Sequence, residues 1–252
     1  MMFLVNRPVL LFLATVIVLW ASGRIGAAFR SRMTLPESAR ADFGIVLGAI
    51  LTLLGLIIGF TFSMATTRYD QRKNLEEEEA NAIGTEYVRV DFLAAGDAAR
   101  LKDLLRQYTK LRVQFYNANY GAELDRINVE TEKMQDQLWT ITGQAAKVQP
   151  TPLAALASSG MNDVLNSQGY TQAAWWNRIP TAAWCLLFVI AILASSLLGY
   201  GSTGKWTLLS LVMPLAIGIS FFLISDIDSP RGGVIHVRAV NIEALDHALN
   251  GH

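Results

Sequence analysis

The longest apolar run of the sequence passes directly into a charged segment. Residues 44–65 contain no charged side chain, and residues 66–87 are rich in arginine and glutamate. At about 1.5 Å per helical residue, the apolar run is long enough to cross roughly 30 Å of hydrocarbon. No proline interrupts residues 44–87. The pattern therefore predicts one continuous helix that crosses a membrane and extends into water.

Three other apolar runs, at residues 1–22, 180–200 and 206–224, predict further spans. Tryptophan and tyrosine side chains near the ends of these runs suit the membrane interface. The first run could instead be a signal peptide with the small residues 21–23 as its cleavage site. We favour a retained span, because residues 1–5 lengthen the apolar run.

The segment between the second and third spans has soluble character. Apolar residues recur in it at helical spacing, and no strand-like alternation occurs. The sequence therefore predicts an all-α polytopic membrane protein, with four transmembrane helices and a helical bundle between spans two and three. The predicted parts are spans one and two in residues 1–66, the soluble bundle continuing helix two in 67–179, spans three and four in 180–225, and a tail in 226–252.

Local signals predict some boundaries inside the soluble part and the tail. A helix should end near Gln149 and Pro150, and the next should begin at Thr151 and Pro152 and cover residues 153–165. The tail should contain a turn around Pro230 and a short helix over residues 241–249.

Composition narrows the range of functions. The chain has 252 residues, of which 52% are hydrophobic and 17% charged, and its mean hydropathy is +0.32, which is typical of a membrane protein. Its formal net charge of zero gives no indication of nucleic-acid binding. The single cysteine, Cys185, can form neither an intrachain disulfide nor a cysteine zinc site.

Nothing in the sequence indicates catalysis. The three histidines all lie in the tail, and no catalytic or phosphate-binding motif is present. We therefore expect neither an enzyme nor a cofactor. Asp226 and Asp228 with His236 match no defined metal-binding loop, so we interpret them as a polar turn just outside the membrane.

Small residues form a stripe along the second span. In lipid, such a stripe lets helix backbones approach closely. Two interpretations stay open, namely packing against other helices of the same chain, and packing against copies of the chain around an axis in an oligomer. The stripe, at spacings of three and four residues, consists of Gly44, Gly48, Thr52, Gly55, Gly59 and Ser63.

Two glutamates follow the apolar face of the emerging helix. Glu79 and Glu86 continue the apolar stripe, so each must be buried with a partner or face a water-filled lumen. Arg72 lies one heptad before Glu79 and is the expected partner from a neighbouring helix. The glutamate run that begins at Glu76 is otherwise expected to be a solvated face, with Arg72 and Glu76 as a surface pair.

Residues 58–75 resemble the second membrane helix of the bestrophin anion channels. That helix has a Gly-Phe pair and then a Thr-Arg-aromatic step, and Gly59-Phe60 and Thr67-Arg68-Tyr69 stand in the matching places. Over most of its length the chain also resembles a bacterial family usually labelled bestrophin-like, through the segments TTRYDQRKNLEEEEANAIG and FLISDIDSPRGG.

The resemblance implies a homo-oligomer, pentameric like the channels, that conducts inorganic anions across the bacterial inner membrane. It also implies that the bundle and both termini are cytoplasmic, whereas the positive charges flanking the spans favour this orientation only narrowly. It carries the hydrophobic neck of the pore onto Thr52, Leu56 and Phe60, with Leu54 on the opposite face of the helix. Thr52 departs from the bulky apolar pattern, so its ring should be wetter.

One property of the bestrophin channels is not expected here, and an alternative function stays open. Some bestrophins bind calcium through an acidic cluster after the last membrane helix. In this chain residues 231–234, which follow Asp226 and Asp228, contain no acidic side chain, so we do not expect calcium binding. The alternative function is a non-conducting membrane scaffold or sensor whose helical bundle binds a partner protein.

Overall fold

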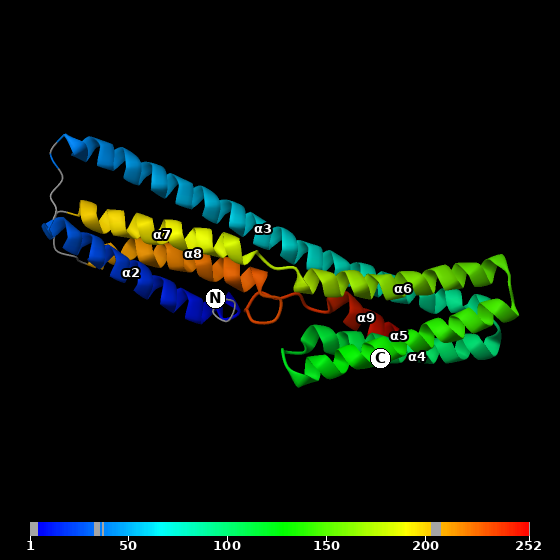
Figure 1. Ribbon diagram of the computed structural model, residues 1–252. Helices are drawn as coiled ribbons and strands as arrows, with labels where there is room; N and C mark the ends of the chain where they lie inside the picture. Colours follow the sequence, from blue (N-terminus) through cyan, green and yellow to red (C-terminus); the bar gives the residue numbers. More distant parts are fainter. Residues whose placement is uncertain (1–4, 33–35, 37, 203–207, 252) are drawn as a thin grey trace. The chain divides into compact units, whose positions relative to one another are not determined.

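The computed structural model describes residues 5–32, 36, 38–202 and 208–251, and in these residues it contains helices and no strand. The all-α prediction is therefore confirmed for the described chain. The elements are α2 (Pro8–Arg32), α3 (Ala39–Arg89), η1 (Val90–Phe92), α4 (Ala95–Asn117), α5 (Ala122–Val148), α6 (Pro152–Trp176), α7 (Thr181–Gly201), η2 (Leu208–Leu211), α8 (Val212–Asp228) and α9 (Val240–Asn250) (Figure 1).

The chain divides into two compact units. The first comprises Met1–Arg68 and Arg178–His236, and the second comprises Tyr69–Asn177 and Val237–His252. The boundary falls inside the uninterrupted helix α3, so the predicted continuous helix is present.

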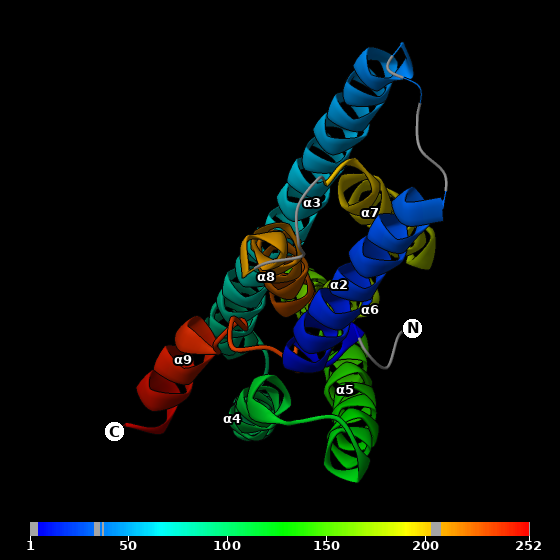
Figure 2. The same cartoon turned by 90° about the vertical axis from the view of Figure 1, so that its left-hand side faces the viewer.

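In the first unit, α2, α7 and α8 pack against one another (Figures 1 and 2). Glycines allow the closest approach between α2 and α7. A Cβ added at Gly26 would lie 1.9 Å from the carbonyl oxygen of Ser196, and one added at Gly199 would lie 1.9 Å from that of Gly23. Small residues at a helix crossing are the usual means of close packing in lipid.

Three segments of the described chain, Pro8–Arg30, Ala39–Phe92 and Pro152–Gly201, are long and apolar enough to cross a membrane. The fourth predicted span coincides with η2 and α8, but its start at Trp206 lies outside the described residues, and α8 has 17 residues. A fourth span therefore stays a prediction. Residues 1–4 of the first predicted span, and part of the link before Trp206, also lie outside the description.

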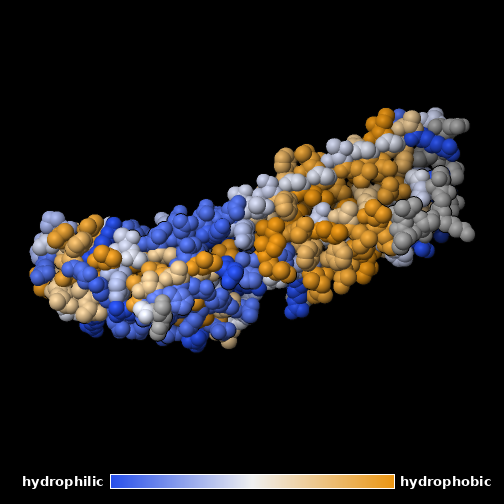
Figure 3. All heavy atoms as spheres, turned by 180° about the vertical axis from the view of Figure 1, so that it is seen from behind, coloured by the Kyte–Doolittle hydropathy of each residue, from blue (hydrophilic) through white to orange (hydrophobic). Residues whose placement is uncertain are grey.

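Apolar side chains cover much of the surface of the first unit, whereas the second unit presents mostly polar side chains (Figure 3). This distribution suits lipid for the first unit and water for the second. Exposed apolar side chains of the first unit include Val9, Ile17, Ile45, Val189, Leu193 and Ile219.

The second unit is a helical bundle that includes α4, α5, α6 and α9. Its main apolar cluster contains Leu101, Leu105, Leu138 and Met161. A smaller cluster includes Ile242 of α9, so the short helix predicted in the tail packs into the bundle.

The proline signals between α5 and α6 are confirmed, but the predicted end of α6 is wrong. Helix α5 ends at Val148, and α6 begins with Thr151 as its N-cap, whose hydroxyl accepts a hydrogen bond from the amide of Ala154. Helix α6 then continues to Trp176 instead of ending at residue 165. Its later part buries small polar residues such as Thr171, which carry no apolar signal.

Candidate functional site

The three residues expected to form a neck lie on one ridge of α3, in the first unit. Leu56 is 53% exposed and Phe60 is 63% exposed, and Thr52 is exposed as well. Residues four apart stand one above the other on a helix, so these side chains form one row. The opposite face is the one that packs inside the chain, because Leu54 is 3% exposed.

The glycine stripe lies beside this ridge and is equally uncovered by its own chain. A Cβ added at Gly48, Gly55 or Gly59 would meet nothing within 4 Å, and Ser63 is exposed. In the most apolar part of α3, only 6% of the residues are buried by the chain. Close packing through this stripe within one chain is therefore not observed.

Small residues do pack inside the chain, at a place that the sequence pattern does not indicate. The close approach lies between α2 and α7, at Gly26 and Gly199. The spacing of small residues along one helix does not predict this contact, because the two glycines come from segments that are far apart in sequence. Only the folded chain brings them to one crossing.

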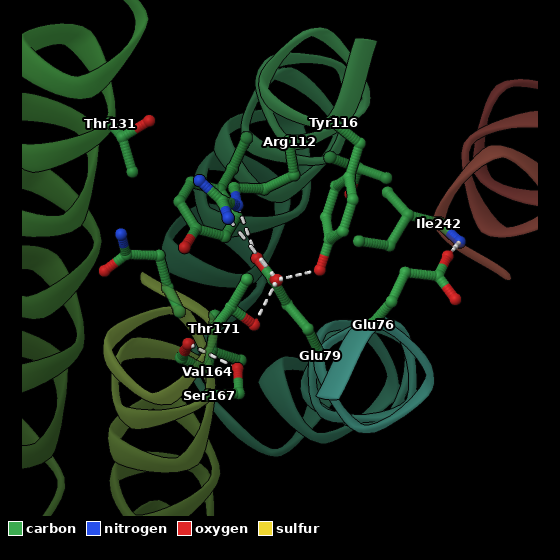
Figure 4. A network of polar contacts seen from close by, with 12 residues as sticks. Glu76, Glu79, Arg112, Tyr116, Thr131, Val164, Ser167, Thr171 and Ile242 are labelled. Carbon is green, nitrogen blue, oxygen red and sulfur yellow. Dashed lines mark hydrogen bonds and ion pairs between the residues drawn. The ribbon is translucent and has the colours of Figure 1, made fainter. Parts of the chain in front are cut away.

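Glu79 is the centre of a buried polar network in the second unit (Figure 4). Its carboxylate forms an ion pair with Arg112 of α4, whose Nε and Nη2 both donate to it. It also accepts hydrogen bonds from the Tyr116 hydroxyl at 3.1 Å and the Thr171 hydroxyl at 3.0 Å. A buried carboxylate with this set of donors is fully compensated.

The network fixes the charge states around Glu79. Burial raises the pKa of Tyr116, and the Glu79 charge raises it further, so the phenol stays protonated and donates. Burial by itself lowers the pKa of Arg112, but the Glu79 carboxylate, together with Tyr108 and Tyr116, more than offsets this, and the net shift is upward. The Arg112 guanidinium also lies over the Phe115 ring, 4.2 Å from its centroid.

The expected pairing of Glu79 with Arg72 is wrong for the single chain. Arg72 is buried, and its Nε and Nη2 donate to the carbonyl oxygens of Ala174 and Asn177, at 3.3 and 3.5 Å. It therefore ties α3 to the end of α6. Arg112 takes the expected position instead, from a helix whose register against α3 the sequence does not give.

Glu76 is also buried, contrary to the solvated face expected for the glutamate run. Its carboxylate accepts hydrogen bonds from the backbone amides of Asn241 and Ile242, at 2.8 and 2.9 Å, and from the Asn241 side chain. These amides belong to the first turn of α9, where a carboxylate is favoured by the helix dipole. Glu77 and Glu78 are exposed, as expected.

Glu86 is the second glutamate of the predicted pair, and its carboxyl group is buried without a hydrogen bond to the described residues. Neither carboxylate oxygen has a hydrogen-bond partner among the described residues. Burial is the largest cause that raises its pKa, to about 8; nearby Asp163 raises it further and Arg89 opposes the shift. A Cβ at Gly160 of α6 would lie 2.0 Å from Glu86 Oε2, so this glycine makes room for the carboxyl group.

The two aspartates at the end of α8 are buried, whereas Val234 and His236 of the following turn are exposed. Asp226 accepts hydrogen bonds from the backbone amides of Val234 and Ile235, both at 2.8 Å. Asp228 accepts from the amide of Ile179 and from Arg178. Within the described residues, no group of three or more His, Cys, Asp or Glu side chains is arranged to hold a metal ion.

Comparison with known families identifies the chain. The bestrophin-like domain matches residues 9–242, which is most of the sequence. The chain belongs to the bestrophin-like family. No curated protein sequence matches this bestrophin-like chain.

Solved structures show that the bestrophin-like chain has the bestrophin fold. A crystal structure of a bacterial bestrophin homologue from Klebsiella pneumoniae matches with a TM-score of 0.65 at 16% identity, covering 96% of this chain and 97% of the other. A mutant of the Klebsiella homologue matches with a TM-score of 0.64 at 16% identity, covering 96% and 99%. A structure described as a mutant membrane protein matches with a TM-score of 0.67 at 16% identity, covering 97% and 98%.

Proposed function

We propose that this protein is an oligomeric ion channel for inorganic anions, in which copies of α3 surround the pore and Leu56 and Phe60 form its hydrophobic neck. Family membership supports a channel. The single observation that carries the proposal is the uncovered face of α3, where the neck ridge and the glycine stripe lie side by side. The alternative, a membrane scaffold or sensor, requires no such pairing of a close-packing stripe with an apolar ridge.

In the proposed channel, the glycines of α3 contact a neighbouring subunit, and the bulky residues of the neck ridge face the pore. The glycines at positions 48, 55 and 59 let a neighbouring backbone approach, which suits a contact between subunits. The bulkier residues Leu56 and Phe60 then face the axis, where an apolar ring excludes a hydrated ion because nothing replaces its lost water. At Thr52 a hydroxyl would make the ring wetter.

The proposed topology has four spans, with the soluble bundle and both termini on the cytoplasmic side of the inner membrane. An even number of spans places both ends of the chain on one side. After replacement of Cys185, single cysteines at Glu123 and His247 should be equally protected from an impermeant thiol reagent added outside intact cells. Both side chains to be replaced are exposed in the second unit. Labelling of only one of them would exclude the four-span arrangement.

The channel itself is tested with the purified full-length protein. Cross-linking and mass measurement in detergent should show a single oligomer, a pentamer by the family resemblance, and reconstituted bilayers should show anion currents. A monomer in mild detergent would argue against the pore. An assembled preparation without current would favour the scaffold, since assembly alone does not require conduction.

A further inference from the structure

A buried charge cluster joins four segments of the first unit. Asp228, at the end of α8, accepts hydrogen bonds from Arg178 Nε at 3.1 Å and from the amide of Ile179, 3.2 Å from each carboxylate oxygen. Arg68 Nη1 of α3 lies 3.8 Å from the same carboxylate. Arg178 Nη1 donates to the Asn6 side chain at 2.8 Å. Two guanidinium groups therefore face one carboxylate, which leaves one positive charge in excess.

Several N–H groups in this cluster are shielded from solvent and donate no hydrogen bond to any of the described residues. They belong to Arg178 Nη2, Arg68 Nη1 and the indole nitrogen of Trp184, whose side chain is 2% exposed. A buried donor left without an acceptor costs roughly 1–3 kcal/mol. Two of these donors, Arg178 Nη2 and the Trp184 indole nitrogen, belong to residues that line one cavity, and they predict an acceptor that the protein does not supply.

A cavity of about 20 Å³ lies at this point. Its lining includes Asn6, Arg178, Thr181, Trp184 and Asp228. This volume holds one water molecule or one monoatomic ion, since a water needs about 10–15 Å³. Phosphate, carboxylates and lipid headgroups are too large.

We infer that this cavity is a binding site for a single halide ion, chloride being the natural occupant. The unpartnered groups at the cavity are all donors, so a cation is excluded and the occupant must be an acceptor. The excess positive charge in a shielded site favours an anion over neutral water. Thr181 begins α7, and the positive end of that helix dipole adds to the attraction.

The carboxylate of Asp228 does not oppose this assignment. Both its oxygens already accept hydrogen bonds, and its single negative charge faces the two guanidinium groups of Arg178 and Arg68. A halide would balance the remaining charge of the cluster. The site is separate from the neck ridge, so its occupancy does not depend on whether the protein conducts.

The test compares halide binding in the full-length protein and in Trp184→Phe. This variant removes the indole N–H but keeps an aromatic ring to pack against Phe221, whose ring centroid lies 6.0 Å from that of Trp184. At constant ionic strength, replacing gluconate by chloride should raise the Tm of the parent. Loss of one hydrogen bond to a charged group should weaken the apparent chloride affinity of the variant about tenfold. Trp139→Phe, at a 48% exposed tryptophan of α5, is the matched control and should titrate like the parent.

A second measurement does not depend on the variant folding. Crystals of the parent grown in bromide should give an anomalous peak between Arg178 and Trp184. If chloride does not change the Tm of the parent, the inference is wrong. It is also wrong if the cavity shows electron density without an anomalous bromide peak, because the cavity then holds water. An equal chloride response in the parent and in Trp184→Phe would equally contradict it.

Discussion

For the buried glutamates of α3, the sequence predicts the burial of each side chain but not its partner. Their position on the apolar face correctly predicts that Glu79 and Glu86 leave the solvent. The partner of Glu79 could not be found by counting along one helix, because Arg112 lies 33 residues away. A signal existed: Arg112 continues the helical spacing of Leu105 and Tyr108, so it too stands on an apolar face. A charge on each of two apolar faces indicates a buried pair.

Glu86 should make the stability of the protein depend on pH. Burial keeps its folded-state pKa near 8, whereas the unfolded chain releases the proton near the ordinary pKa of a glutamate, 4.5. The folded state therefore binds more protons between these values, and its stability should fall as the pH rises from about 5 to about 8. Glu86→Gln removes this titration and should stabilise the protein by about 1–3 kcal/mol at pH 8. Denaturant unfolding at several pH values measures the effect.

The groups that face Glu86 in the described structure are Arg89 of its own helix and Asp163 of α6. These two form an ion pair with each other, at 3.9 Å. Glu78→Gln, at an exposed position of the same helix, is the matched control. A parent and Glu86→Gln with the same pH profile would show that Glu86 ionises normally.

Helices were predictable where the pattern is strongly periodic and less so elsewhere. The continuity of α3 follows from the absence of proline, and the start of α6 follows from its cap. The end of α6 was missed because Gly169 and polar residues obscure the periodicity, and the bundle packing overrides their weak propensity. The crossing of α2 and α7 was missed because it depends on two segments at once.

Substitutions at Gly199 and at Gly59 should affect different properties of the protein, namely the stability of the fold and the assembly of the oligomer. Gly199→Ala puts a Cβ against the Gly23 carbonyl of the same chain, which should destabilise the fold by about 1–3 kcal/mol. Gly59→Leu adds bulk where its own chain leaves open space, so it should weaken assembly and leave the fold of the subunit intact. Thermal unfolding and oligomer mass in detergent separate the two effects. If Gly59→Leu assembles like the parent, the stripe faces lipid.

For the molecule as a whole, the sequence predicted the all-α class and the bestrophin-like family, and the structure and comparisons confirm both. The assembly and the conducted ion could not be predicted from physical patterns alone, because an uncovered apolar helix face fits lipid as well as a neighbouring copy. The face of α3 nevertheless narrows the choice, because it carries glycines that permit close packing next to the bulky side chains of Leu56 and Phe60. A functional experiment on that face separates the remaining possibilities.

Phe60→Ala should raise single-channel conductance in reconstituted bilayers. In the proposed pore, Leu56 and Phe60 make two consecutive apolar rings, and a narrow ring penalises a hydrated ion. Truncation of Phe60 widens the lower ring and should lower this barrier. Anion selectivity should change less than conductance, because the ring carries no charge.

Phe62→Ala is the control that the structure selects. Phe62 is 41% exposed and of the same residue type, but two residues along a helix turn it by about 200°, away from the ridge. Leu54 would serve less well, since it is buried in its own chain and its loss would also disturb packing. Conductance should therefore rise in Phe60→Ala and stay near the parent value in Phe62→Ala. Equal effects of the two variants would mean that α3 is a general packing helix, because a pore wall distinguishes the side of the helix that faces the ion.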